Sequence, residues 1–200
     1  MQRGFKTYVN YCGSCHALGY ARYERTADDL EIPHDLVMAN LVFDDALIGD
    51  LIENAMSKSD AETWFGAAPP DLTLAGRVHS PDWLYTYLRS FYNDSARPLG
   101  TNNTIYQNVG MPNVLYDLQG DVAQECDVLG DHCELHAEGN GLMSLQEFDL
   151  AISDLVNFLY YVGEPVREKR QDIGFWVLLF LGFLYVLAYF LGREFSKDYH

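Results

Sequence analysis

The sequence predicts an all-α fold in which a helical domain with long loops is followed by one transmembrane helix. Apolar residues recur at three- and four-residue intervals in several segments, the alternating pattern of strands is rare, and one uninterrupted apolar segment lies near the C-terminus. With 48% apolar and 21% charged residues, the 200-residue chain is globular in composition and has room for a hydrophobic core.

The charge of the chain excludes one class of partner and is unevenly distributed. A formal net charge of −16 argues against nucleic-acid binding, because phosphate contacts require Lys and Arg. Acidic residues concentrate in 24–62 and 117–138, whereas the C-terminal part of the chain holds most of the apolar excess. The sequence therefore predicts a polar domain joined to a very hydrophobic segment.

The first predicted helix covers about residues 3–15 and carries the motif Cys12-Gly-Ser-Cys15-His16. In a helix this spacing puts both thiols and the imidazole on one face. The thiols can then add to the two vinyl groups of a haem while the imidazole reaches its iron, which is the signature of c-type haem attachment. A redox-active dithiol does not need the histidine, and a zinc ribbon needs a second CxxC that the sequence lacks. We therefore expect one covalent haem c.

The middle of the domain is predicted to be mostly loop with two further helices. The acidic segment 20–43 is expected to be largely irregular, and a helix is expected from about 44 to 56. The tripeptide Ser-Pro-Asp at 80–82 is typical of a helix start, with proline at the first helical position, and predicts a helix over 83–92.

The last helix of the domain is predicted to begin after Ser144. Ser144 and Glu147 match a capping box, and apolar residues then recur at three- and four-residue spacing through Val162. Gly163 and Pro165 end this pattern and mark the boundary of the domain.

A transmembrane helix is predicted over residues 173–192. This segment contains no charged residue and no proline, and at about 1.5 Å per residue it spans about 30 Å, the thickness of the hydrocarbon core of a bilayer. A buried core helix of this composition would need a larger protein around it. We therefore divide the chain into a haem domain over 1–165, a linker over 166–172, the membrane helix and a tail over 193–200.

The basic residues that flank the membrane segment leave its orientation ambiguous. Arg167, Lys169 and Arg170 precede it and Arg193 and Lys197 follow it, so the positive-inside rule favours a cytoplasmic haem domain by one charge. Haem of this type is attached outside the cytoplasm, and that argument outweighs a single charge. The prediction is a single-pass protein of the bacterial inner membrane, with the haem domain in the periplasm and the C-terminal tail in the cytoplasm.

The sixth iron ligand decides whether such a haem carries electrons or reacts with a substrate. An open position admits a substrate, whereas a Met thioether fills it and raises the potential. The candidates are Met38, Met56, Met111, Met143, His34, His79, His132 and His136. Most methionines fill gaps in cores, but Met111 stands out because Gly110 and Pro112 favour a fixed loop around it.

Further landmarks occur in order along the chain. They are Gln2-Arg3-Gly4 before the haem motif, the run WFGAAPPDL from Trp64 to Leu72, Met111-Pro112, the helix end YVGEP at 161–165, and the single C-terminal span. Together they make the sequence similar to the bacterial cytochrome c1 family over essentially its whole length. The haem motif is common to all c-type cytochromes, whereas the WFGAAPPDL run and the C-terminal anchor resemble this family specifically.

The resemblance implies a class I cytochrome c-like haem domain and the residues that serve it. It assigns the thioether bonds to Cys12 and Cys15, the axial ligation to His16 and Met111, the lining of the haem pocket to Pro70, and a propionate contact to Arg77.

The resemblance also implies an electron carrier that is not an enzyme on its own. The chain would be the haem subunit of a dimeric quinol–cytochrome c reductase (bc1 complex), beside cytochrome b in the membrane. Electrons would arrive from a Rieske iron–sulfur protein and leave to a soluble or membrane-anchored cytochrome c. Two alternatives stay open: another anchored mono-haem carrier, such as an oxidase subunit, and a haem enzyme such as a peroxidase, which would need a vacant sixth position.

An acidic insertion over about 117–140 departs from the simplest form of the family. It contains Cys126 and Cys133, the two cysteines outside the haem motif. An oxidising compartment favours a disulfide between them, which would stabilise the fold by about 2–3 kcal/mol. Two roles stay open: the bridge holds the Met111 loop against the haem, or it only staples a surface insertion.

Overall fold

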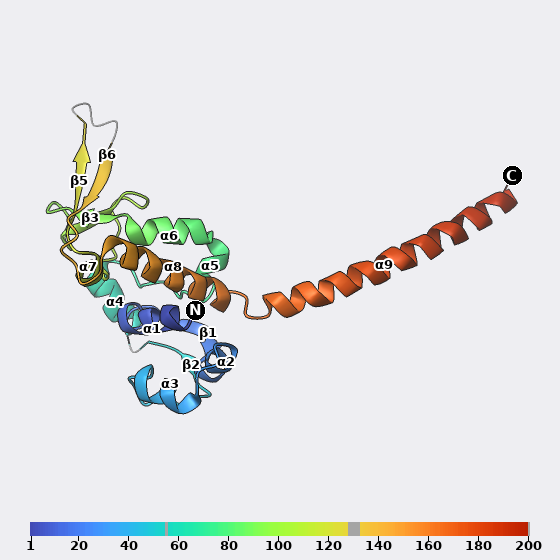
Figure 1. Cartoon of the computed structure of the whole chain (residues 1–200), viewed down its shortest axis with the longest axis horizontal. Helices are drawn as coiled ribbons and strands as arrows, with labels where there is room; N and C mark the ends of the chain where they lie inside the picture. The colour runs from blue at the N-terminus through green and yellow to red at the C-terminus, as the bar shows by residue number, and fades with distance from the viewer. Residues whose placement is uncertain (55, 128–132, 200) are drawn as a thin grey trace. The chain divides into compact units, whose positions relative to one another are not determined.

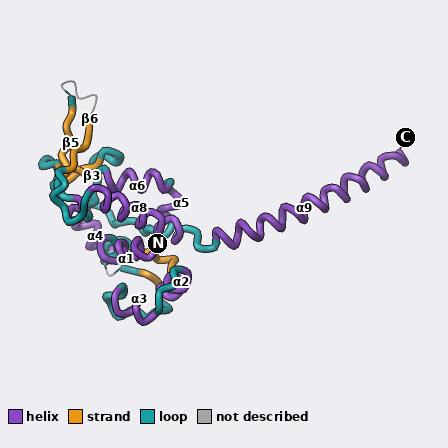
Figure 2. Tube along the Cα trace, in the orientation of Figure 1, coloured by secondary structure: helices purple, strands orange, loops and turns teal. Residues whose placement is uncertain are grey.

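The computed structural model describes residues 1–54, 56–127 and 133–199. The chain separates into two compact units, Met1–Gly163 and Glu164–His200. Figure 1 shows the order of the elements, and Figure 2 shows that helices predominate in the described parts of both units.

The first unit combines short helices with short antiparallel strand pairs. Its helices are α1 (Gln2–Tyr11), α2 (Tyr23–Asp29), α3 (His34–Asn40), α4 (Lys58–Phe65), α5 (Ala75–Val78), α6 (Pro81–Arg89), α7 (Tyr116–Gln119) and α8 (Leu145–Val162). The strand pairs are β1 (Leu18–Arg22) with β2 (Leu51–Ile52), β3 (Phe91–Asn93) with β4 (Thr101–Asn103), and β5 (Val122–Cys126) with β6 (Cys133–Ala137). The domain is therefore mainly helical but not strictly all-α. The sequence did not predict the strands, because strands of two to five residues are too short to show a clear alternation.

The core is organised where α1 packs against α8. Phe5 stacks on Phe158 with ring centroids 5.1 Å apart, Tyr8 meets the same ring in a tilted contact at 5.9 Å, and all three are buried. At Gly4 the two helices approach so closely that a Cβ would collide with the carbonyl oxygen of Asp154. Burying each of these rings contributes about 1.5–3 kcal/mol, so this contact fixes the direction in which the chain leaves α1 toward the haem motif.

Helix α8 begins and ends where the sequence predicts. The Ser144 hydroxyl accepts from the backbone N–H of Glu147 at 3.3 Å, and the Glu147 carboxylate accepts from the Ser144 backbone N–H at 2.9 Å. The helix stops at Val162, directly before Gly163. The predicted capping box and C-terminal break are therefore confirmed.

The predicted helix over 44–56 is wrong. Asp44 accepts from the backbone N–H of Ala46 at 3.1 Å, and Asp50 accepts from that of Leu47 at 2.8 Å. Aspartate side chains that bond to nearby backbone in this way compete with helical hydrogen bonds. The segment instead forms turns that lead into β2.

Two helix ends and the secondary structure of one segment also differ from the predictions. The first helix ends at Tyr11 instead of residue 15, and α6 ends at Arg89 because β3 takes over from Phe91. The acidic segment 20–43 is not irregular, since it contains most of β1 and all of α2 and α3.

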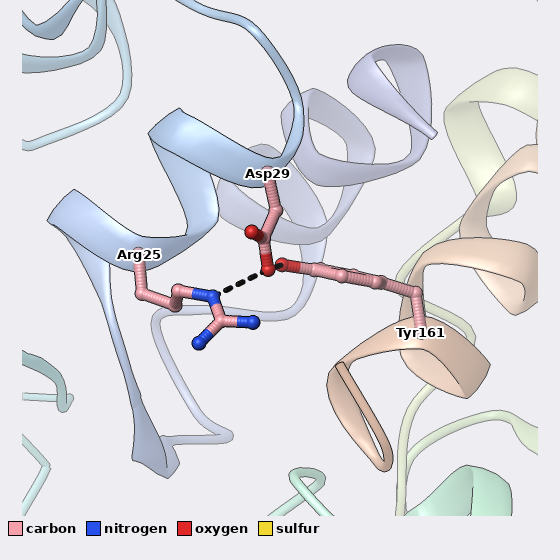
Figure 3. A network of polar contacts seen from close by, with 3 residues as sticks. All are labelled: Arg25, Asp29 and Tyr161. Carbon is pink, nitrogen blue, oxygen red and sulfur yellow. Dashed lines mark hydrogen bonds and ion pairs between the residues drawn. The ribbon is translucent and has the colours of Figure 1, made fainter. Parts of the chain in front are cut away.

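A polar contact ties this acidic segment to the core. Asp29 on α2 accepts from Arg25 Nε at 2.6 Å and from the Tyr161 hydroxyl of α8 at 2.7 Å, as Figure 3 shows. Burial raises the pKa of Tyr161, so its hydroxyl remains a donor. Residues 132 positions apart in the sequence are thus joined through one carboxylate.

The second unit consists mainly of α9 (Arg167–Phe195), followed by the 3₁₀ turn η1 (Ser196–Tyr199). Its most apolar 18-residue window has a mean hydropathy of 2.3, and the predicted span 173–192 lies within the helix. By length and composition, α9 suits a membrane span.

Candidate haem site

The haem motif lies in a turn that directly extends α1. The backbone N–H groups of Cys15 and His16 both donate to the Cys12 carbonyl, at 3.1 and 2.9 Å. Both thiols are available for thioether bonds, because the disulfide of the chain joins the other two cysteines. Burial raises the pKa of Cys12 to about 12, while Cys15 is half-buried. The motif therefore keeps a helix-like spacing one turn beyond the helix itself.

The His16 ring is oriented by a backbone carbonyl. Its Nδ1 lies 2.7 Å from the Pro70 oxygen. A carbonyl only accepts, so Nδ1 carries the proton and Nε2 keeps its lone pair for a metal. Burial lowers the pKa of His16, which favours the neutral imidazole that a metal requires. Pro70, which is predicted to line the haem pocket, thus sets the ring orientation of His16, the predicted proximal ligand.

Hydrogen bonds from three other segments hold the turn in place. The Tyr8 hydroxyl donates to the His16 carbonyl and Asn54 Nδ2 donates to the Cys15 carbonyl, each at 2.5 Å. Asp71 accepts from the backbone N–H of Gly19 at 2.7 Å. The sequence did not single out Tyr8 or Asn54; Asp71 had a signal, because it lies in the WFGAAPPDL run.

The Met111 segment contacts the same run near its start, at Phe65. A Cβ at Gly110 would be 3.2 Å from the Phe65 carbonyl oxygen, so the Met111 segment packs against the end of α4. There Gly66 adopts a φ of +80° as the helix cap, a conformation that favours glycine. The run from Trp64 to Leu72 therefore contacts the Met111 segment near one end and His16 near the other.

The Met111 sulfur has a hydrogen-bond donor close to it. The hydroxyl of Tyr87, on α6, lies 3.5 Å from Met111 Sδ. Burial raises the pKa of Tyr87 to about 12, so this hydroxyl is protonated at neutral pH.

Asparagine side chains shape the loop that leads to Met111. Asn103 is fully buried: its Nδ2 donates to the Tyr87 carbonyl at 2.8 Å, and its Oδ1 accepts from the N–H groups of Ile105 and Tyr106 at 2.9 and 3.1 Å. Asn102 Oδ1 accepts from the N–H of Asn108 at 2.9 Å. These residues had no recognisable signal in the sequence, because asparagines in a loop are common.

Comparison with known proteins identifies the family. The family model for the cytochrome c1 family matches residues 43–199. The cytochrome c1 of Allochromatium vinosum is 50% identical, over 100% of this chain and 84% of that protein. The chain belongs to the cytochrome c1 family.

Other relatives extend the range of the similarity. The ammonia monooxygenase gamma subunit of Nitrosomonas europaea is 41% identical, over 100% of this chain and 83% of that protein. The cytochrome c1 of Rhodospirillum rubrum is 26% identical, over 99% of this chain and 81% of that protein. Cytochrome c1 proteins are electron-transport proteins with a covalently attached haem c, so this chain carries one, and α9 is its transmembrane anchor.

The residues around the motif fit this haem. Large apolar side chains are exposed on the segments next to the predicted ligands, among them Trp64 at 63%, Val78 at 74% and Tyr106 at 60%. Covering side chains of this size with an apolar group lowers the free energy, because apolar surface is removed from water. An imidazole with a free Nε2, two adjacent thiols and apolar flanks together match what a covalently bound haem requires.

The other candidate ligands have different surroundings in the cytochrome c1 domain. Met38 and Met143 pack against the hydrophobic core, and His79 stacks on Trp83 with ring centroids 4.1 Å apart. His34 lies 2.8 Å from an Asp28 oxygen. His132 is outside the described residues.

Arg77 lies on α5, where a Cβ at Gly163 would be 2.9 Å from its Cγ. The stem of Arg77 therefore lies against the end of α8. Its predicted contact with a haem propionate stays a prediction.

A disulfide joins Cys126 of β5 to Cys133 of β6 at directly paired positions of the hairpin. At the other end of this ladder, Asp121 accepts from Asn93, Tyr116 and Asn140, each within 2.9 Å. The bridge is thus at the opposite end of the described hairpin from Asp121. Its effect on the Met111 loop stays a prediction.

Proposed function

We propose that this chain is the electron-carrying subunit of a quinol–cytochrome c reductase, accepting single electrons from a Rieske iron–sulfur protein and passing them to a cytochrome c. The observation that carries the proposal is the Trp64–Leu72 run, which contacts both predicted ligand segments. It holds His16 Nδ1 through the Pro70 carbonyl and packs against Gly110 through Phe65. One short segment thereby contacts His16 and the residue before Met111, the two predicted ligands.

In this proposal Cys12 and Cys15 would form the thioether bonds to the haem, and His16 and Met111 would hold its iron. The haem would supply a one-electron couple, and the residues of the chain would supply fixed ligands. The Pro70 carbonyl orients the imidazole, and the bonds to the carbonyls of Cys15 and His16 hold the turn. With both His16 and Met111 holding the iron, the site would carry electrons and would not bind a substrate.

Partners and topology follow from the same proposal. Cytochrome b would contact α9 in the membrane of a dimeric complex, and the haem domain, residues 1–165, would lie in the periplasm. The linker 166–172 and the span 173–192 would lead to a cytoplasmic tail over 193–200. The net charge of −16 suits a basic cytochrome c as acceptor, either soluble or membrane-anchored.

A reporter that is active only in the periplasm tests this topology. Fused after residue 200, it should give no signal, whereas the same reporter fused after residue 165, at the end of the haem domain, should be active. A strong signal from the C-terminal fusion would reverse the proposed orientation.

A second candidate function is an anchored mono-haem carrier that serves a different membrane oxidoreductase. The 41% identity to a protein named as an ammonia monooxygenase gamma subunit favours testing it. In that case the same haem site would have other partners, and only the proteins bound to the chain would distinguish the two functions.

Purification of the full-length tagged chain in mild detergent separates these functions. We expect cytochrome b and a Rieske protein to copurify, together with antimycin-sensitive reduction of cytochrome c by a quinol. Membranes with the untagged chain provide the control. Copurification of a different oxidoreductase, without cytochrome b, would replace the first proposal by the second.

A further inference from the structure

We infer that Tyr87 is a positioning residue for the sixth iron ligand, and that its hydroxyl raises the reduction potential through a hydrogen bond to Met111 Sδ. The hydroxyl lies 3.5 Å from the sulfur. Within the described residues, this sulfur is the hydrogen-bond partner of that hydroxyl. The inference rests on the proposed role of Met111 as a ligand.

Aromatic contacts on two sides restrict the orientation of the Tyr87 ring and therefore the direction of its hydroxyl. It stacks on Trp83 with centroids 5.0 Å apart and an interplanar angle of 6°. On its other side it meets Phe91 edge-to-face at 5.3 Å. These residues are four apart along the chain, so they line one face of α6 and its extension into β3.

The backbone of Tyr87 is fixed to the loop that carries the ligand. Asn103 Nδ2 donates to the Tyr87 carbonyl at 2.8 Å, while Asn103 Oδ1 holds the N–H groups of Ile105 and Tyr106. One buried side chain therefore ties the donor helix to the start of the Met111 loop. The fold therefore keeps the Tyr87 hydroxyl close to the Met111 sulfur.

The effect on the potential follows from the chemistry of the thioether. A ligating sulfur gives one lone pair to the iron and retains another that can accept a hydrogen bond. A donor at that lone pair withdraws electron density and weakens the donation to Fe(III) more than to Fe(II). The hydrogen bond therefore favours the reduced form.

The test compares Tyr87→Phe with Tyr85→Phe in the full-length holoprotein. Both variants remove one hydroxyl from the same helix, but the Tyr85 ring lies against Arg89, 4.9 Å from ring centroid to guanidinium carbon, instead of near Met111. We expect Tyr87→Phe to shift the redox equilibrium toward Fe(III) by about twofold to tenfold, which is a potential roughly 20–60 mV lower. Tyr85→Phe should leave the potential unchanged. Equal potentials in the two variants would overturn the inference.

Two further variants separate this inference from the proposed function. Met111→Leu should abolish the sulfur-to-iron charge-transfer band of the oxidised protein; an unchanged band would overturn both the ligand assignment and the role of Tyr87. If the band is lost, adding Tyr87→Phe to Met111→Leu should cause no further shift. A shift of the same size in both backgrounds would show that Tyr87 acts on the haem independently of the sulfur, and would overturn the inference alone.

Discussion

The two sides of the haem site are held by different means. On the His16 side, the motif is part of a turn that continues α1, and its partners bond mainly to backbone carbonyls. On the other side, Met111, the predicted sixth ligand, lies in a loop that asparagine side chains shape, and a tyrosine hydroxyl lies close to its sulfur. The first side is stabilised by local chain geometry, whereas the second depends on side chains from several segments.

This difference predicts that single substitutions disturb the Met111 side more than the His16 side. A helical turn keeps most of its backbone bonds when one partner is lost. A loop without regular backbone bonding relies on each buried polar side chain that closes it.

The largest expected effect is that of Asn103→Ala. The substitution removes the fully buried Asn103 amide and leaves three part-buried groups without their partner: the N–H groups of Ile105 and Tyr106 and the Tyr87 carbonyl. Each unsatisfied buried group costs about 1–3 kcal/mol, with some relief from relaxation, so we expect a loss of roughly 2–4 kcal/mol in the free energy of unfolding. Urea titration of the holoprotein measures it.

Asn40→Ala is the matched control, because Asn40 is exposed and its Nδ2 donates to the Leu36 carbonyl one turn earlier. It should change stability by less than about 0.5 kcal/mol. Similar losses in the two variants would show that the buried asparagine does not close the loop.

The next largest effect is expected from removing the disulfide. The Cys126→Ala, Cys133→Ala double variant frees a loop of seven-residue separation, and we expect a loss of about 2–3 kcal/mol. Because the bridge lies at the end of the hairpin ladder away from Asp121, we expect the potential of the haem to stay the same. A lowered potential together with the loss of stability would instead assign the bridge a role at the Met111 loop.

A smaller effect is expected for Asn54→Ala on the His16 side. It removes one hydrogen bond to the Cys15 carbonyl, and the turn keeps its bonds to the Cys12 carbonyl. We expect a loss of about 0.5–1.5 kcal/mol in thermal or urea unfolding, with the haem still covalently attached. A loss as large as that of Asn103→Ala would remove the contrast between the two sides.

The smallest expected effect is a loss of stability at low pH at the Asp121 end of the β5–β6 hairpin. Hydrogen bonds from Asn140, Asn93 and Tyr116 hold the pKa of Asp121 below its ordinary value. A carboxyl with a lowered folded pKa contributes stability above its unfolded pKa of about 3.9, and this contribution disappears as the pH falls through the folded pKa. The protection of the β5 amides, measured relative to the intrinsic exchange rate at each pH, should therefore decrease below about pH 4, and Asp121→Asn should remove that pH dependence. A decrease that persists in the variant would assign it to another group.

Several features were determined by the sequence alone because their causes are local. The haem motif depends on residues four positions apart, and the ends of α8 depend on Ser144, Glu147 and Gly163. The membrane span needs only length and apolar composition, and 173–192 lies within α9. The helix predicted over 44–56 shows the limit of such arguments. There the Asp44 and Asp50 side chains accept hydrogen bonds from nearby backbone N–H groups, which compete with helical bonding.

The contacts that make the haem site were decided only by the tertiary structure. His16 and Pro70 are 54 positions apart, Tyr87 and Met111 are 24 apart, and Asn54 is 39 positions from Cys15. No local pattern encodes such pairs, since the residues of each pair lie on separate segments that only the folded core brings together. The sequence by itself thus predicted the residues for haem attachment and identified the membrane-spanning segment, while the packed core decided which residues contact the predicted ligands.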